Sequence, residues 1–444
     1  MFSIIFKKYL PACLALLLPA GSIFAQKILS LEEAVATALQ NNYQIQLSKN
    51  DSLVAALDYG YRNAVFLPTL NGLLGTTWNN NNQRQTLADG SERESSGIRS
   101  NNLQGSVALN WVLFDGFKMF ATRDKAEELL RAGSFIIKEE VVNTVADVVT
   151  TYYNIARQQQ LIKATEVQIE LNEERVKLAQ NKLDIGTGNK PDVLQSKVDL
   201  NAQKALKMQQ ETYVSQLKDQ LVQVMNSNID AAAFEVPDTI PVNDQLALGD
   251  IRANLESTNP SLLLSRSQIE IAGHTLRESK ADLLPTLSFN SAYNFNRTNN
   301  QKVVNPFSPL FNQASGFNYG FTVNVPIFDR FAARRQIKQN ELNLSFQKLN
   351  YQNQVSLLNL SILNAYKNYE QQKRALKLEE ENIQLAQENV DIVFQTYRLG
   401  MATLIQLREA QLSLAQAFDR LIAARYNTKL AETELMRLKG DILK

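Results

Sequence analysis

The sequence lacks most of the side chains from which catalytic and metal sites are built. It contains one cysteine, Cys13, and one histidine, His274, among 444 residues. A zinc site or a Ser-His triad cannot be assembled from so few of the usual groups. The GTG at Gly186 to Gly188 lacks the lysine spacing of a phosphate-binding loop. These absences predict a protein that is not an enzyme and that holds no metal and no cofactor.

The sequence also lacks a large net charge and a long apolar run. The chain has 46 Lys and Arg against 45 Asp and Glu, so no basic field attracts nucleic acid. After the first 25 residues no stretch approaches the roughly 20 apolar residues that a membrane helix requires. Any later membrane crossing is therefore expected to be made of β-strands.

Residues 1–25 are typical of a secretory signal peptide. Lys7 and Lys8 precede a largely apolar run from Leu10 to Phe24, and Ala25 offers a small residue for cleavage. Cys13 lies in an LPAC context that suggests lipid attachment, but almost no apolar run separates it from Lys8. The mature chain is expected to begin near Gln26, without cysteine and therefore without disulfides.

The mature chain contains an internal repeat. FLPTL near residue 66 is matched by LLPTL near residue 283, and Phe114-Asp115 is matched by Phe328-Asp329. The separation of Phe114 from Phe328 equals that of Gly186 from Gly400, and we call this constant separation the repeat offset. We expect a first structural repeat over 26–236, a linker over 237–249 and a second repeat over 250–444, each with a helix, a strand hairpin, a long helix and a return helix.

Heptad periodicity predicts one long helix in each repeat. In the first repeat, apolar and small residues recur at alternating steps of three and four, and the pattern persists one repeat offset later. A second apolar row, Leu171, Leu178 and Ile185, is matched by Leu385, Ile392 and Leu399, so each helix is expected to have two neighbours, as in a ring of helices. A solvent-exposed coiled-coil stalk is the alternative. The seam comprises Val141, Thr144, Val148, Thr151, Ile155, Gln158, Ile162, Thr165, Ile169, Asn172, Val176, Ala179 and Leu183.

The predicted long helix runs from about Gly116 to Ile185, which corresponds to about 105 Å at 1.5 Å per residue. Shorter helices over about Tyr43 to Val65 and Asp192 to Met225 are expected to stack end to end beside it. Between the helices, segments of about ten residues alternate apolar with Asn, Ser and Gln side chains, which is typical of strands that cross a bilayer at a tilt. The side chains expected to face lipid are Trp111, Phe289, Tyr293, Phe295, Tyr319 and Phe321.

The segments Asn79 to Asn102 and Arg297 to Gly316 are expected to be long polar hairpin loops, as outer-membrane barrels have on their outer side. Four strands cannot close a membrane barrel, since the smallest have about 8. The barrel is therefore expected to be shared between chains. A soluble sheet whose apolar face packs on helices is the alternative that four strands alone leave open.

The stretches NKLDIGTGNKPDVLQSKVDL and TYRLGMATLIQLREAQLSL, within this repeat, resemble the helix-tip signature of the TolC family of outer-membrane efflux proteins. The resemblance covers nearly the whole mature chain. It implies a mixed α and β membrane protein, a homotrimer with four strands per chain in one shared β-barrel, continued by a long α-helical coiled-coil barrel. It also implies an inner-membrane pump and a periplasmic adaptor protein, which docks at the turns around Gly186 and Gly400.

The resemblance further implies a gate at the helix tips. Asp192, Tyr397 and Glu409 occupy the positions of the family's gate residues, whereas Ala402 stands where some relatives have arginine and Gln406 where they have aspartate. We therefore expect an outer-membrane channel subunit of a tripartite efflux pump or secretion system, a passive duct that extends into the periplasm. The alternatives are a periplasmic or surface coiled-coil structural protein and a lipid-active helical bundle, neither of which needs the alternating strands.

Overall fold

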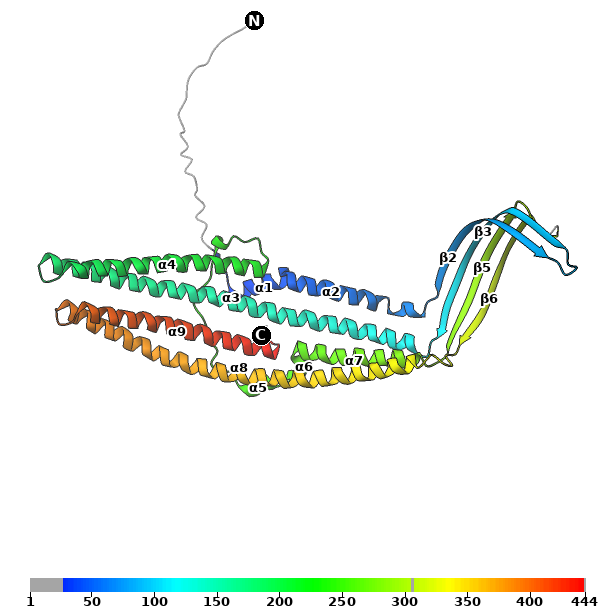
Figure 1. Cartoon of the computed structure of the whole chain (residues 1–444). Helices are drawn as coiled ribbons and strands as arrows, with labels where there is room; N and C mark the ends of the chain where they lie inside the picture. The colour runs from blue at the N-terminus through cyan, green and yellow to red at the C-terminus, as the bar shows by residue number, and fades with distance from the viewer. Residues whose placement is uncertain (1–26, 305–306, 443–444) are drawn as a thin grey trace, which may run out of the picture.

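The computed structural model describes residues 27–304 and 307–442, so the expected signal peptide lies outside the described residues. The molecule is elongated: long helices run side by side, and a four-stranded sheet extends from one end (Figure 1). The expected long helices are present as α3, Lys118–Asp184, and α8, Ala332–Arg398, each of 67 residues. Each extends about 100 Å at 1.5 Å per residue.

The helices of the two halves keep the same spacing in the sequence. The return helices are α4, Lys190–Met225, and α9, Leu404–Lys439, each of 36 residues. The helices of the second half, α8 and α9, begin and end one repeat offset after α3 and α4. The spacing seen in the sequence therefore extends to both boundaries of each of these helices.

Shorter helices complete two of the four helical columns. In one column α4 is continued by α1, Leu31–Asn41, and α2, Tyr43–Gly60; in another, α9 is continued by α7, Pro260–Ala281. Asparagine side chains join the stacked ends, because they donate hydrogen bonds to carbonyl groups that the helix ends leave free. The Nδ2 atoms of Asn42, Asn226 and Asn259 donate to the carbonyl oxygens of Val224, Asn41 and Leu438 at 2.8, 2.7 and 2.8 Å.

The order of the helical columns equals the order of the strands. The antiparallel sheet has the order β2-β3-β5-β6, and the columns follow as α2 with α4, α3, α7 with α9, and α8 (Figure 1). Consequently β2 and α2 lie at one lateral edge and β6 and α8 at the other. The strands are β2 Thr69–Thr86, β3 Glu92–Phe114, β5 Thr286–Asn300 and β6 Phe311–Asn324.

The strands are longer than predicted: most of the first predicted loop and half of the second are strand. β2 and β3 contain 18 and 23 residues, and β5 and β6 contain 15 and 14. Pairing continues from Thr69 with Asn110 out to Thr86 with Glu92. The prediction was wrong because main-chain hydrogen bonds hold an antiparallel ribbon together whether its side chains are polar or apolar. The β2–β3 hairpin therefore extends past the last pair of β3 with β5, Ser100 with Asn300.

Each long helix begins directly after two residues in the left-handed backbone conformation. Gly116 and Phe117 have φ of 71°, and their counterparts Arg330 and Phe331 have φ of 59° and 63°. At Gly116 a Cβ atom would lie 2.6 Å from the carbonyl oxygen of Ala281, so only glycine fits. These pairs redirect the chain from strand into helix.

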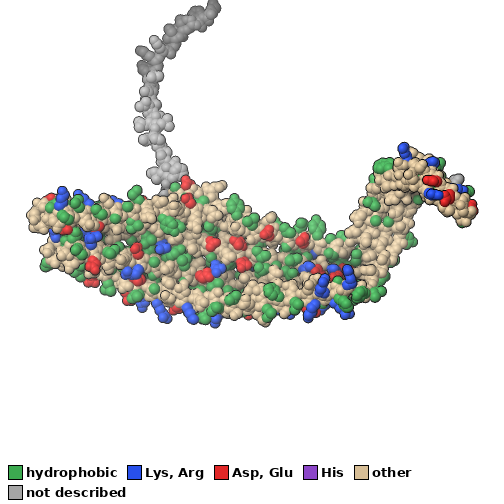
Figure 2. All heavy atoms as spheres, in the orientation of Figure 1, with side chains coloured by type: hydrophobic (Ala, Val, Ile, Leu, Met, Phe, Trp, Pro, Cys, Tyr) green, Lys and Arg blue, Asp and Glu red, His purple; other side chains and the backbone are tan. Residues whose placement is uncertain are grey.

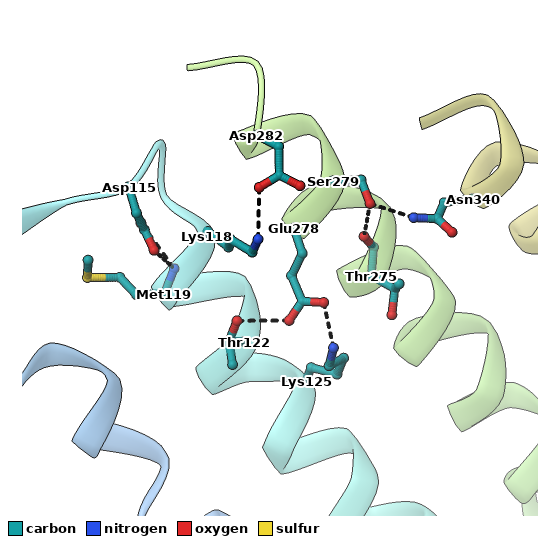
Figure 3. Close-up of polar contacts among 10 residues, drawn as sticks. All are labelled: Asp115, Lys118, Met119, Thr122, Lys125, Thr275, Glu278, Ser279, Asp282 and Asn340. Carbon is teal, nitrogen blue, oxygen red and sulfur yellow. Dashed lines mark hydrogen bonds and ion pairs between the residues drawn. The ribbon is translucent and has the colours of Figure 1, made fainter. Parts of the chain in front are cut away.

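Polar contacts lock the junction between sheet and helices (Figure 3). The Asp115 carboxylate accepts hydrogen bonds from the Met119 amide at 2.9 and 3.2 Å, which gives a partner to an amide that the first turn of α3 leaves free. Lys118 forms an ion pair with Asp282 of 2.8 Å, and Glu278 of α7 accepts from Thr122 at 2.8 Å. These contacts fix α7 against the start of α3 and hold the helices in place where the strands emerge.

A small belt crosses the helices near the middle of their length. β1, Lys27–Ile28, pairs in parallel with β4, Phe234–Glu235. The Tyr152 hydroxyl, which is buried, donates to the Leu29 carbonyl at 2.8 Å, and Lys218 donates to that of Phe234 at 2.8 Å. The remaining short elements are η1 Arg62–Phe66, η2 Ala231–Ala233, α5 Leu248–Arg252 and α6 Leu255–Thr258.

Candidate functional site

The two helical turns at the end far from the sheet form the candidate site. Gly186 and Gly400 have φ of 73° and 82°, the left-handed conformation that ends a helix. The amides of Gly186 and Thr187 donate to the carbonyl oxygens of Leu183 and Lys182 at 3.0 and 2.9 Å. Both glycines are exposed, and a Cβ atom added to either would meet no atom within 4 Å. They therefore serve the backbone turn and leave the tips accessible.

The return helices start with side-chain caps. The Asn189 side chain accepts from the Asp192 amide at 2.9 Å, which fixes the first turn of α4. In α9, Thr403 and Gln406 form a reciprocal capping box, with the Thr403 amide donating to Gln406 Oε1 at 2.8 Å. Gln406 thus has a structural role at a position where relatives were expected to carry aspartate.

Tyr397 connects the two tips. Its side chain is buried, and the Lys182 ammonium of α3 lies 3.9 Å from the centre of its ring and donates to its carbonyl oxygen at 2.7 Å. Burial raises the pKa of the Tyr397 phenol; the Asp192 carboxylate adds to this rise and Arg175 opposes it. Tyr397 and Asp192, two of the three gate candidates, therefore lie close enough at the tips for the carboxylate to act on the phenol.

The third candidate, Glu409, is exposed on α9 and lines a cavity of about 440 Å³ between α3, α4 and α9. Among the described residues no hydrogen bond or ion pair joins it to Asp192 or Tyr397. The cavity instead contains a polar network that sequence reasoning missed. Arg175, only 2% exposed, lies 2.6 Å from Asp199 and donates to Gln411 at 2.8 Å.

Arg408 shares the same carboxylate, with its Nε 2.9 Å from Asp199 Oδ2. Burial lowers the pKa of the Arg175 guanidinium, and the Asp199 carboxylate opposes that shift. A signal for this network exists in the sequence: Arg175 and Asp199 are matched one repeat offset later by Asn389 and Ser413. Both members of this ion pair therefore differ in charge from their counterparts in the second half.

The six aromatic side chains expected to face lipid lie on one face of the sheet, which we call the aromatic face. Pairing places Trp111 beside Phe289 and Phe289 beside Phe321, and in antiparallel sheets directly paired residues share a face. Tyr319 and Phe321 are 73% and 68% exposed. The opposite face carries Asn71, Asn110, Asn290 and Asn318.

A model of the outer membrane efflux protein family matches residues 34–227 and 252–441, which together cover most of the chain. The chain belongs to this family. It is 20% identical over 440 residues to outer membrane protein TolC of Escherichia coli K12, covering 98% of this chain and 87% of that protein. It is 23% identical over 345 residues to outer membrane efflux protein BepC of Brucella suis biovar 1, covering 75% and 71%.

The fold is that of solved channels as well. The CmeC outer membrane channel of Campylobacter jejuni superposes with a TM-score of 0.76 at 16% identity, covering 93% of this chain and 86% of that one. The family match confirms the predictions of an outer-membrane efflux channel and of a location in the outer membrane. None of the described helices is long and apolar enough to cross a membrane, and no group of three potential metal ligands occurs among the described residues.

Proposed function

We propose that three copies of this efflux protein close into a ring, with a shared barrel of twelve strands above a shared tunnel of helices. The observation that carries the proposal is the matched order of strands and columns. It leaves β2 and α2 unpartnered at one edge and β6 and α8 unpartnered at the other. One rotation therefore brings β2 beside the neighbour's β6 and α2 beside the neighbour's α8, which is a ring-forming, head-to-tail contact.

Apolar stripes on both lateral helices support the same contact. On α2, Tyr43, Leu47, Val54 and Leu57 are 57 to 61% exposed, on the side opposite to Ile45, which is buried against the protein. On α8, Leu342, Phe346, Leu349, Leu357 and Leu360 are 53 to 62% exposed and recur at helical spacing. Two long open strand edges add unpaired amide and carbonyl groups, which proteins rarely leave uncovered.

The ring accounts for the aromatic face and the gate candidates together. With the aromatic face in lipid, the asparagine-rich face lines a wet lumen. The duct then narrows at the helix tips, where the buried Tyr397 lies near Asp192 and the exposed Glu409 adds a second carboxylate. A periplasmic adaptor protein docks at the exposed turns of Gly186 and Gly400 and couples the duct to an inner-membrane pump, in a tripartite assembly. The two repeats, 26–236 and 250–444, joined by 237–249, contribute equivalent columns.

A native mass measurement of the signal-cleaved protein in detergent tests the ring. We expect three copies per particle. Leu57→Glu in α2 places a charge in the proposed contact and is expected to release monomers, whereas Gln44→Glu, exposed on another side of the same helix, is the matched control. Trimers that survive Leu57→Glu unchanged would place the contact elsewhere, and wild-type monomers without conductance in planar bilayers would refute the proposal.

A further inference from the structure

A polar patch interrupts the aromatic face at the end far from the helices. Trp78 pairs with Asn101 and Asn101 with Asn299, while Asn80 pairs with Arg99 and the Gln301 amide donates to the Arg99 carbonyl. These pairs form two rows across β2, β3 and the end of β5, all on the aromatic face. A cavity of about 390 Å³ lies among them, and Asn79 and Ser100, the pair between the two rows, line it as well. We call this the distal patch: Trp78, Asn80, Arg99, Asn101, Asn299 and Gln301.

The depth of the distal patch follows from the strand geometry. Leu287, near the start of β5, and Arg297 lie on the same face of that strand, about ten residues apart. At about 3.4 Å per residue and a tilt of roughly 40°, they span about 26 Å along the membrane normal, close to the roughly 25 Å apolar band of such barrels. Arg297 and the distal patch therefore lie where hydrocarbon gives way to head groups. Figure 2 shows charged side chains gathered at this far end of the sheet, beyond green and tan surface.

The charged groups at this level are available to a ligand. Within the described residues Arg99 forms no ion pair, and Arg297 only lies against the Phe311 ring, with its Cζ 5.5 Å from the ring centre. Carboxylates begin farther along the hairpin, at Glu94 and at Glu92, and Glu92 already pairs with Arg84. Trp78 is 72% exposed. The surface thus offers two guanidinium groups, one indole face and several amide side chains.

We propose that the distal patch and Arg297 bind a phosphorylated glycolipid of the outer leaflet. Guanidinium groups form paired, charge-assisted hydrogen bonds to phosphate. Asparagine and glutamine side chains offer both donors and acceptors to sugar hydroxyls, and the indole supplies a flat apolar surface for a sugar ring. The inference rests on the proposed placement of the aromatic face in lipid, since only then does the patch meet lipid head groups.

Native mass spectrometry of the detergent-solubilised, signal-cleaved protein, titrated with a rough lipopolysaccharide of defined structure, tests this site. Arg99→Gln with Arg297→Gln is expected to weaken binding at least tenfold, and Trp78→Ala several-fold. Arg84→Gln with Arg93→Gln removes the same charge from the hairpin beyond the patch, so this matched control is expected to bind like the wild type. The affinity of the wild type for dephosphorylated lipid is expected to be at least tenfold lower than for the phosphorylated lipid.

Equal affinity of the wild type and the Arg99/Arg297 variant would overturn the site, and so would an equal loss in the control pair, because that would indicate nonspecific attraction of charge. The oligomer mass in the same spectra reports whether each variant is folded. Conductance in phospholipid bilayers separates this inference from the proposed function: a conducting protein without selective lipid binding refutes only the site, whereas a non-conducting protein refutes the channel itself.

Discussion

The network around Asp199 predicts an asymmetry between two substitutions. Asp199→Ala leaves the Arg175 guanidinium buried, at 2% exposure, with Gln411 as its remaining partner. Removing one partner of a buried ion pair costs about 3–5 kcal/mol. Arg175→Met instead removes the charge and fills the space with an apolar chain, while Asp199 keeps Arg408 and Gln195 as partners. Replacing a buried pair member in this way costs about 0–1.5 kcal/mol.

The expected difference is roughly 1.5–5 kcal/mol, which corresponds to about 10-fold to about 5,000-fold in the equilibrium for local opening of the tips. Hydrogen exchange of peptides from 168–180 and 405–415 measures this opening directly. Asp219→Ala, exposed on the same helix and without an ion pair among the described residues, is the matched control. Exchange that is equally fast in Asp199→Ala and Arg175→Met would refute the assignment of Arg175 as a charge that depends on Asp199.

Three further predictions concern the tips, the belt and the junction. Asp192→Ala and Tyr397→Ala are expected to enlarge single-channel conductance in planar bilayers relative to Asp219→Ala. An unchanged conductance would mean that the gate lies at other residues. Burial raises the pKa of Tyr152 to about 12, above the unfolded value near 10, so its stabilising contribution is complete below pH 10 and is lost as the pH rises to about 12. In Tyr152→Phe the free energy of unfolding should therefore fall less steeply with pH over that interval. An unchanged dependence of this free energy on pH would contradict the prediction. Asp115→Ala removes the acceptor of the Met119 amide and is expected to cost about 1 kcal/mol. Hydrogen exchange should become faster in the first turn of α3 alone.

Much of the helical architecture could be predicted from the sequence because it repeats and is periodic. The heptad rows before Gly186 and Gly400 define two long helices of equal length, and in the structure their ends are separated by the same repeat offset as the two glycines. Helix turns are local, since a glycine in the left-handed conformation at the end of a heptad row ends the helix there. The alternation at Phe289 and Tyr319 likewise indicated which side chains share a face.

The rest depends on contacts between distant parts of the chain. The Arg175 network joins α3, α4 and α9, and no local pattern shows that Gln411 would accept a hydrogen bond from a residue 236 positions away. The extended β2–β3 hairpin was missed because its polar side chains are typical of loops while its main chain pairs as strand. Ala402 and Gln406, where the resemblance implied arginine and aspartate in relatives, received no role from the sequence.

The left-handed pairs Gly116-Phe117 and Arg330-Phe331 sit at one end of uninterrupted helices that reach about 100 Å toward the tips. A change in the direction of either long helix at the sheet therefore moves its far end the most. Over that length, a reorientation of about 3° displaces the far end by about 5 Å, roughly the width of a small side chain. A change in helix direction this small would therefore suffice to move the tips of a duct gated there, with every helix still folded.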